Sequence, residues 1–269
     1  MTFDLGPAIL FCPADRPERY AKAFERADAV ILDLEDAVSP ADKTAARGFL
    51  IESELDPARV IVRVNPLASD AFAADLATLS QTDYRTIMLA KAESPKRIAK
   101  IDRRFRLVAL LETAKGVSQA ERIAELDNVI ALMWGGEDLV ASIGGMSSRK
   151  PNGRYRDIAR YARARTLLAA GAREKAAIDA VHLDFSDTKR LRIEATDAAA
   201  SGFAATACVH PSQVEVIRAA YRPDPADVAW ARNVLARAEE ERGVFTFEGR
   251  MVDEPVLRHA RAILRRAGA

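Results

Sequence analysis

Short runs rich in Val, Ile and Leu recur along this chain of 269 residues, and their spacing limits the fold classes that the chain can adopt. Stretches rich in Ala, Arg and Glu, with the length and period of helices, separate the runs. Strands that alternate with helices form βαβ units with a parallel sheet, and strands covered on both faces have continuous apolar sequences. About eight runs favour a closed barrel over an open sheet, so we predict an α/β fold, a (β/α)8 TIM barrel. The runs are 8–12, 29–34, 60–64, 86–89, 107–111, 129–134, 177–183 and 205–209.

The chain changes character after the eighth run. Residues 211–220 have the pattern of a last barrel helix, and Pro223-Asp224-Pro225 then interrupts the chain before a helix over 226–242. Residues 243–249 are typical of an extended segment closed by a turn, and a basic amphipathic helix follows over 254–266. We therefore predict a catalytic barrel domain over 1–222 and a helical and extended C-terminal extension over 223–269.

Charged or amide residues end almost every apolar run. In a barrel all of them would meet at the carboxyl ends of the strands, where barrel active sites are built. Taken singly, each one could instead be a helix N-cap or a solvated loop residue. They are Asp15, Arg16, Asp33, Glu35, Asp36, Arg63, Asn65, Lys91, Glu93, Glu112, Glu137, Asp138, Asp184, Asp187, His210 and Gln213.

Glu112 and Asp138 form the strongest pair, at the ends of the fifth and sixth predicted strands. Adjacent strands lie about 4.8 Å apart, so the two carboxylates would repel each other unless a cation or a shared proton lies between them. An all-oxygen site without His or Cys suits Mg²⁺, which takes one or two protein carboxylates and keeps water or substrate in its other positions. The alternative is that neighbouring Arg or Lys residues neutralise both groups.

Arg63 interrupts the otherwise apolar third run. A buried guanidinium needs a partner, and its useful role would be to stabilise a carboxylate, enolate or thioester oxygen beside a metal ion. The alternative is a structural ion pair with Asp33, Glu35 or Asp36, and both can hold together.

Phe11, Arg16 and Lys22 form a second group around the end of the first run. An apolar side chain followed by two cations could hold the adenine and phosphates of a nucleotide-bearing substrate. By spacing alone, ordinary surface cations are the simpler interpretation.

The charge balance and the missing motifs exclude several classes of function. Lys and Arg number 40 against 39 Asp and Glu, a formal net charge of +1, so we expect no nucleic-acid partner. The N-terminal apolar run is too short for a signal peptide or a membrane span, and the two Cys residues stand far apart, so we expect no membrane partner and a cytoplasmic location. GxGxxG, GxxxxGK[ST], GxSxG and HExxH are absent, so nicotinamide binding, P-loop chemistry, serine hydrolysis and zincin chemistry lack support.

Seven ordered segments together resemble the citrate lyase β-subunit-like family, which includes malyl-CoA and citramalyl-CoA lyases. They are LFCPADRPER (10–19), VILDLED (30–36), VRVN (62–65), ALLETA (109–114), GGEDL (135–139), VHPSQ (209–213) and GRMVDEP (249–255). The resemblance implies a TIM barrel, usually a homotrimer. It also implies a reaction that makes or breaks a carbon–carbon bond between acetyl-CoA and a 2-oxo acid with Mg²⁺.

The resemblance also assigns roles to individual residues. Asp253 matches an acidic residue that extends into a neighbouring subunit's site as a general acid or base, and Glu35 and Asp36 match acidic positions that would hold metal-bound water or Arg63. One departure occurs where the family usually has Pro and Val and this chain has Ala90 and Ala92, which predicts a local loop adjustment. The remaining matches are Glu112 and Asp138 as metal ligands, Arg63 beside the metal, and Phe11, Arg16 and Lys22 as the residues that hold an acyl-CoA.

Three other functions stay open at this point. The chain could be a citrate lyase β-type subunit that needs partner chains and an acyl carrier protein. It could be an aldolase acting on free hydroxy-oxo acids, although no histidine precedes His182. It could also be a catalytically silent CoA-thioester-binding protein. The sequence selects neither the 2-oxo acid nor the dominant reaction among cleavage, condensation and thioester hydrolysis.

Overall fold

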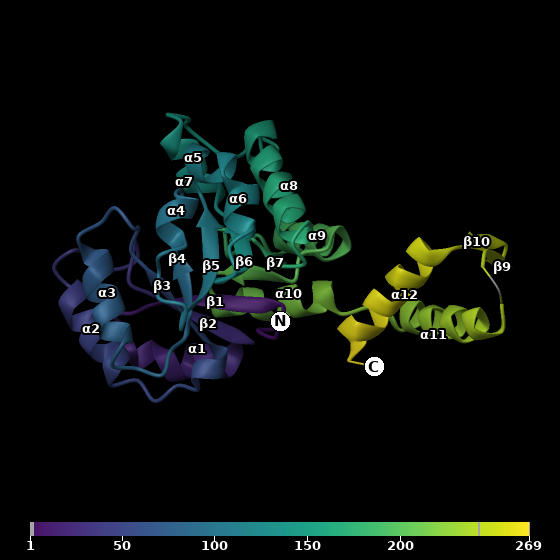
Figure 1. Ribbon diagram of the computed structural model, residues 1–269, viewed down its shortest axis with the longest axis horizontal. Coiled ribbons are helices and arrows are strands. Elements are labelled where there is room, and N and C mark those ends of the chain that lie inside the picture. Colours follow the sequence, from purple (N-terminus) through teal and green to yellow (C-terminus); the bar gives the residue numbers. More distant parts are fainter. Residues whose placement is uncertain (1–2, 242, 269) are drawn as a thin grey trace. The chain divides into compact units, whose positions relative to one another are not determined.

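Eight parallel strands close into a barrel in which each strand pairs with its sequence neighbours and β8 pairs with β1 (Figure 1). The computed structural model describes residues 3–241 and 243–268. The predicted (β/α)8 barrel is confirmed. The strands are β1 (Ala8–Pro13), β2 (Ala29–Asp33), β3 (Val60–Val64), β4 (Thr86–Leu89), β5 (Arg106–Leu111), β6 (Val129–Trp134), β7 (Ala176–Asp179) and β8 (Ala205–Cys208).

Helices connect the strands and cover the outer face of the barrel (Figure 1). The α-helices are α1 (Tyr20–Arg26), α2 (Lys43–Ile51), α3 (Ala71–Leu79), α4 (Pro95–Ile98), α5 (Ala114–Ser118), α6 (Ala120–Ala124), α7 (Gly136–Ser142), α8 (Asp157–Gly171), α9 (Thr188–Ser201) and α10 (Val214–Tyr221). Three short 3-10 helices, η1 (Pro17–Arg19), η2 (Pro57–Arg59) and η3 (Pro211–Gln213), precede α1, β3 and α10.

The barrel interior is filled by apolar side chains that point inward from alternate strand positions. The outward-facing residues are buried as well, because the helices pack on them, and this explains the continuous apolar runs in the sequence. The interior cluster is Leu5, Ile9, Ala29, Ile31, Ile61, Met88, Val108, Leu110, Ala131, Met133, Ile178, Ala205 and Ala207. A core packed in this way leaves polar chemistry to the ends of the strands.

The seventh strand is shorter than the sequence predicts. It ends at Asp179, whereas the apolar run continues to Leu183, which is exposed. Asp179 is buried and bonded to Arg163 and to the indole of Trp134. The chain therefore leaves the barrel at a buried charged residue.

The chain divides into two compact units, residues 1–217 and 218–269, where the sequence interpretation placed the division after residue 222. The second unit holds α11 (Pro225–Glu240), a hairpin of β9 (Phe245–Phe247) and β10 (Arg250–Val252), and α12 (Glu254–Ala267). Residue 242, the predicted end of the first of these helices, lies outside the described residues.

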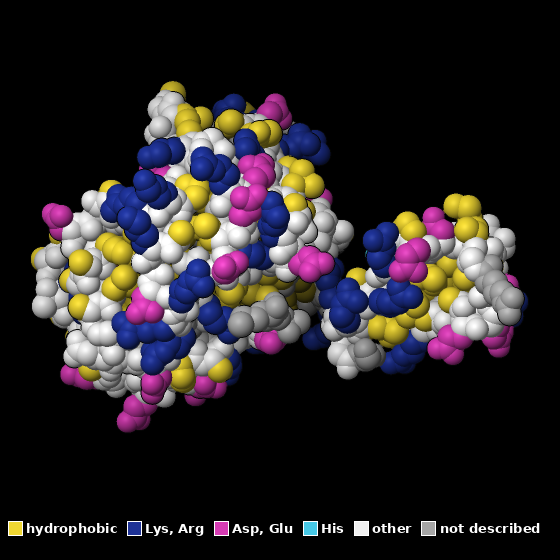
Figure 2. Space-filling model, viewed as in Figure 1, with side chains coloured by type: hydrophobic (Ala, Val, Ile, Leu, Met, Phe, Trp, Pro, Cys, Tyr) yellow, Lys and Arg dark blue, Asp and Glu magenta, His cyan; other side chains and the backbone are white. Residues whose placement is uncertain are grey.

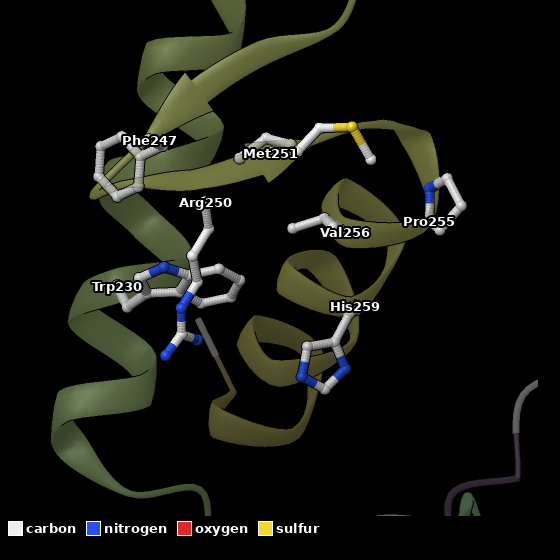
Figure 3. A pocket seen from close by; sticks show the side chains of 8 residues that line it. Trp230, Phe247, Arg250, Met251, Pro255, Val256 and His259 are labelled. Carbon is white, nitrogen blue, oxygen red and sulfur yellow. The ribbon is translucent and has the colours of Figure 1, made fainter.

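The second unit has a hydrophobic core of its own, centred on Ala231, Val234, Val252 and Ala260. A hollow of about 370 Å³ lies beside it, and Figure 3 shows side chains from α11, β9, β10 and α12 around it. The lining residues are Trp230, Phe247, Arg250, Met251, Val252, Pro255, Val256 and His259.

Charged side chains of both signs are interspersed over the face of the barrel unit shown in Figure 2, in keeping with the balanced formal charge. Among the described residues, no helix combines the length and the apolar character that a membrane crossing requires.

Candidate functional site

Asp33 and Arg63 form a buried ion pair at the carboxyl ends of β2 and β3. The two residues are register partners across these strands, so the fold places their side chains next to each other. Arg63 donates from Nε and Nη2 to the two carboxylate oxygens of Asp33, each at 2.6 Å. Burial alone would lower the pKa of Arg63, but the hydrogen bonds and charge of Asp33 raise it above its ordinary value. The ion pair expected as an alternative for Arg63 is therefore present, and the guanidinium stays charged.

Glu35 lies between two cations. Its Oε2 is 3.2 Å from Nη1 of Arg63, and its Oε1 accepts a hydrogen bond from the ammonium group of Lys91. Burial raises the pKa of Glu35, while Arg63 and Lys91 act in the opposite direction. Asp36 is largely exposed and accepts a bond of 3.1 Å from Lys91, which lowers its pKa although its partial burial works against this. The loop that follows β2 and carries Glu35 and Asp36, here called the second loop, is thus fixed by Arg63 of β3 and by Lys91, which follows β4.

Glu112 directly follows β5 and has a side chain that is only 3 % exposed. Burial raises the pKa of this carboxyl group to about 8, and the charge of Asp138 adds to the shift, while Arg63 and Lys91 reduce it. Asp138, in the first turn of α7, is 40 % exposed and gives the pair a side open to solvent. The two carboxyl groups of the predicted pair therefore lie close enough to interact, and ionising both of them costs free energy.

Gly135 permits the close approach of β5 and β6 at this point. A Cβ atom at this position would lie 2.8 Å from Cβ of Glu112, closer than real Cβ contacts. Glycine is therefore required beside the buried carboxylate.

The acidic cluster fits a cation ligand. Five carboxylates (Asp33, Glu35, Asp36, Glu112 and Asp138) face two cationic groups (Arg63 and Lys91), which leaves three negative charges if all are ionised. Among the described residues, no group of three or more His, Cys, Asp or Glu side chains is placed to hold a metal ion by itself. A hard cation held by two carboxylates, with water or substrate in its other positions, agrees with this donor set.

A buried network behind the site holds the second loop in place. The ammonium group of Lys43 donates to the carbonyl oxygens of Leu34 and Glu35 and to Oδ1 of Asn65, at 2.7 to 2.9 Å. Asn65 in turn donates from its backbone and its side chain to the fully buried carboxylate of Asp75. Asn65 was predicted at a strand end, whereas Lys43 and Asp75 were not predicted, because nothing in their spacing marks them.

The three residues predicted to hold CoA differ in their exposure. Phe11 packs against the barrel interior, and the guanidinium of Arg63 lies 5.0 Å from its ring centroid. Arg16 and Lys22 are exposed, Arg16 before η1 and Lys22 on α1. Phe11 is thus placed beside the acidic site, while the role of the two cations in holding CoA stays a prediction.

Asp253 is the N-cap of α12 in the second unit. Its Oδ1 accepts a bond of 3.3 Å from the backbone N–H of Val256, a structural role that it fills within its own unit. Its predicted role in a neighbouring subunit's site is not tested by this contact.

Two histidines lie after the last two barrel strands. His182 is buried, with Nδ1 2.9 Å from Glu194, and Glu194 also binds Arg149. His210 is exposed, caps η3 and stacks on Phe185 with 4.8 Å between ring centroids. Both histidines therefore have structural partners.

The fold and the site together define a class of protein. A closed parallel barrel with an acidic, cation-bearing site at the carboxyl ends of its strands is the architecture of (β/α)8-barrel enzymes. The family model of the HpcH/HpaI aldolase/citrate lyase family matches residues 8–211. The chain belongs to this family and is a carbon–carbon lyase, as its sequence segments predicted.

Named relatives agree with this assignment. The chain is 54% identical over 263 residues to a citrate lyase subunit beta-like protein of Mycobacterium tuberculosis, covering 98% of this chain and 96% of the relative. It is 31% identical over 286 residues to the mitochondrial citramalyl-CoA lyase of Homo sapiens, covering 94% and 83% of the two chains. It is also similar to the crystal structure of CitE from M. tuberculosis in complex with magnesium, acetoacetate and coenzyme A. That match has a TM-score of 0.93 and 53% identity and covers 98% of each chain.

Proposed function

We propose that this enzyme is a Mg²⁺-dependent lyase of 3-hydroxyacyl-CoA thioesters of the citramalyl-CoA or malyl-CoA type, which releases acetyl-CoA and a 2-oxo acid. The observation that carries the proposal is the buried Glu112 beside Asp138, with the paired Arg63 next to them. The relative of known structure binds magnesium, acetoacetate and coenzyme A, and a human relative is a citramalyl-CoA lyase.

Glu112 and Asp138 would hold the magnesium ion, since their mutual repulsion is relieved by a cation between them. When bound, Mg²⁺ supplies a Lewis acid that polarises the hydroxyl and carboxylate oxygens of the substrate. Glu35 and Asp36 would orient metal-bound water, and Glu35 would also fix Arg63 through the contact described above.

Arg63 would stabilise the negative charge that develops on the thioester oxygen when the carbon–carbon bond breaks. Its two hydrogen bonds to the carboxylate of Asp33 fix the guanidinium plane, so little side-chain freedom is lost during the reaction. Asp253 of a neighbouring subunit would act as general base and acid: it would accept the proton that the substrate hydroxyl loses as the carbonyl forms, and return a proton to the carbon of the acetyl-CoA fragment. This role requires a homo-oligomer, which we propose to be a homotrimer.

Phe11, Arg16 and Lys22 would bind the CoA part of the substrate. The exposure of both cations suits contacts with phosphate groups, which remain partly hydrated when bound. We further propose that the protein works in the cytoplasm on free CoA thioesters.

The test is an acetyl-CoA release assay on citramalyl-CoA, malyl-CoA, 3-hydroxy-3-methylglutaryl-CoA and citryl-CoA, with and without Mg²⁺. We expect metal-dependent cleavage of one of them, and Arg63→Ala should lower kcat by about 10² because one preorganised charge-stabilising group is lost. Arg103→Ala, at an exposed position, is the matched control. Turnover by Arg63→Ala near the wild-type rate would refute the role of Arg63. A folded, Mg²⁺-binding protein that cleaves none of the four substrates would favour a subunit acting on an acyl carrier protein.

A further inference from the structure

Lys91 carries the ammonium group on which the acidic site converges. Its Nζ lies 3.1 Å from Oδ2 of Asp36, 3.7 Å from Oδ1 of Asp138 and 4.0 Å from Oε1 of Glu112, and it also donates to Oε1 of Glu35. The two proposed metal ligands and the two acidic residues of the second loop therefore share one cation of the protein.

The backbone places Lys91 in this position. Its φ of 49° lies in the left-handed region, which residues other than glycine rarely adopt. Its N–H donates a bond of 2.9 Å to Oε1 of Glu112, and the N–H groups of Ala90 and Ala92 donate to carbonyl oxygens of β3 and β5. Lys91 is thus tied to both neighbouring strands and to Glu112, unlike a lysine that moves freely on the surface.

Ala90 contributes to this arrangement through its backbone N–H group. Its N–H donates a hydrogen bond of 3.3 Å to the carbonyl oxygen of Val64 in β3. This bond joins the backbone directly before Lys91 to the neighbouring strand.

The position of the ammonium group sets up a competition. Nζ lies within 4.0 Å of one oxygen of each proposed ligand, so its positive charge would repel a divalent cation held by Glu112 and Asp138. Without the metal, the same ammonium group offsets the repulsion among the four carboxylates. One side chain thus lowers the energy of the metal-free site and raises that of the loaded one.

We infer that Lys91 is the tethered counter-cation of this site, a positioning residue that holds the four carboxylates together in the metal-free protein and weakens the binding of a divalent cation. The inference rests on the proposed function, because it takes Glu112 and Asp138 as the metal ligands. If Lys91 has this role, removing its ammonium group tightens the binding of the metal.

The test is a titration of the full-length metal-free protein with Mn²⁺, followed by calorimetry and by the EPR signal of free Mn²⁺. Lys91→Met should bind Mn²⁺ at least about tenfold more tightly than the wild type, because the variant lacks a unit positive charge 3.7 and 4.0 Å from oxygens of the two proposed ligands. Lys100→Met, an identical change at an exposed position, should leave the affinity unchanged. As a second readout, saturating Mg²⁺ should raise the Tm more in Lys91→Met than in the wild type. The metal-free variant has no ammonium group to offset the repulsion among the four carboxylates, so it gains more from the bound metal.

The outcomes separate this inference from the proposed function. If the wild type binds Mn²⁺ through Glu112, shown by loss of binding in Glu112→Gln, and Lys91→Met binds it equally or more weakly, the inference is overturned alone. If the wild type binds no Mn²⁺, or binds it equally after Glu112→Gln, the metal site and this inference fall together. Should Lys91→Met not fold, Lys91→Gln, which keeps a hydrogen-bond donor near Glu35 without a charge, is subject to the same expectation.

Discussion

The raised pKa of Glu112 makes the stability of the metal-free barrel depend on pH. At about 1.4 kcal/mol per pKa unit, the rise from 4.5 to about 8 corresponds to a free energy on the order of 5 kcal/mol. The folded state keeps its proton to a higher pH than the unfolded chain does. It therefore binds more protons between these two pKa values, and the free energy of unfolding falls as the pH rises through this interval.

Glu112→Gln isolates this effect. The amide is neutral at every pH and retains an oxygen that can accept the bond from the N–H of Lys91. Between about pH 6 and about pH 8.5, the metal-free wild type should lose about 2 to 3 kcal/mol of stability relative to the variant. Saturating Mg²⁺ should remove this difference in slope, because the metal takes the place of the proton.

Urea unfolding followed by tryptophan fluorescence measures the difference. The chain has two tryptophans, and Trp134 is buried at the end of β6 while Trp230 belongs to the second unit. In a Trp230→Phe background, Trp134 is the remaining tryptophan and its fluorescence reports the unfolding of the barrel. Unfolding of the second unit then does not contribute to the measured transition. Parallel stability curves for the wild type and Glu112→Gln over this pH range would refute the reasoning.

Two further predictions concern single residues. Gly135→Ala should destabilise the barrel by about 1 to 3 kcal/mol and weaken Mg²⁺ binding, because its Cβ would displace Glu112. Gly48→Ala, where an added Cβ meets nothing within 4 Å, should instead be stabilising by up to about 1 kcal/mol, and equal thermal shifts in the two variants would contradict the steric argument. Asp253→Asn keeps a side-chain oxygen for the α12 cap, so it should preserve stability, while turnover should fall by about 10² if Asp253 acts as an acid. Full acetyl-CoA release by Asp253→Asn would exclude that role.

Most of the barrel could be predicted from the sequence because its strands are buried on both faces and leave continuous apolar runs. The seventh strand was predicted too long, since Val181 and Leu183 extend the run past Asp179 although the chain has already left the barrel. In the second unit, the sequence predicted an extended segment and missed that β10 pairs with it. Its turn uses Glu248 and Gly249, both with positive φ, and Glu-Gly is a weaker turn signal than Asn-Gly.

The candidate site was predicted as a set of residues but not as a set of contacts. The rule that polar groups end the strands located Arg63 and Glu112 correctly at one rim, because parallel strands share a direction. The left-handed backbone at Lys91 was not predictable, since no glycine marks it, and the direction of its ammonium group follows from that conformation. Periodicity states which residues reach the rim, whereas side-chain direction depends on local backbone angles.

The separate hydrophobic core of the second unit has an evolutionary consequence. Because Ala231, Val234, Val252 and Ala260 pack among themselves and not into the barrel cluster, substitutions in one core need no compensating change in the other. Substitutions can therefore accumulate in the core of the second unit, the unit that carries Asp253, without disturbing the packing of the barrel interior.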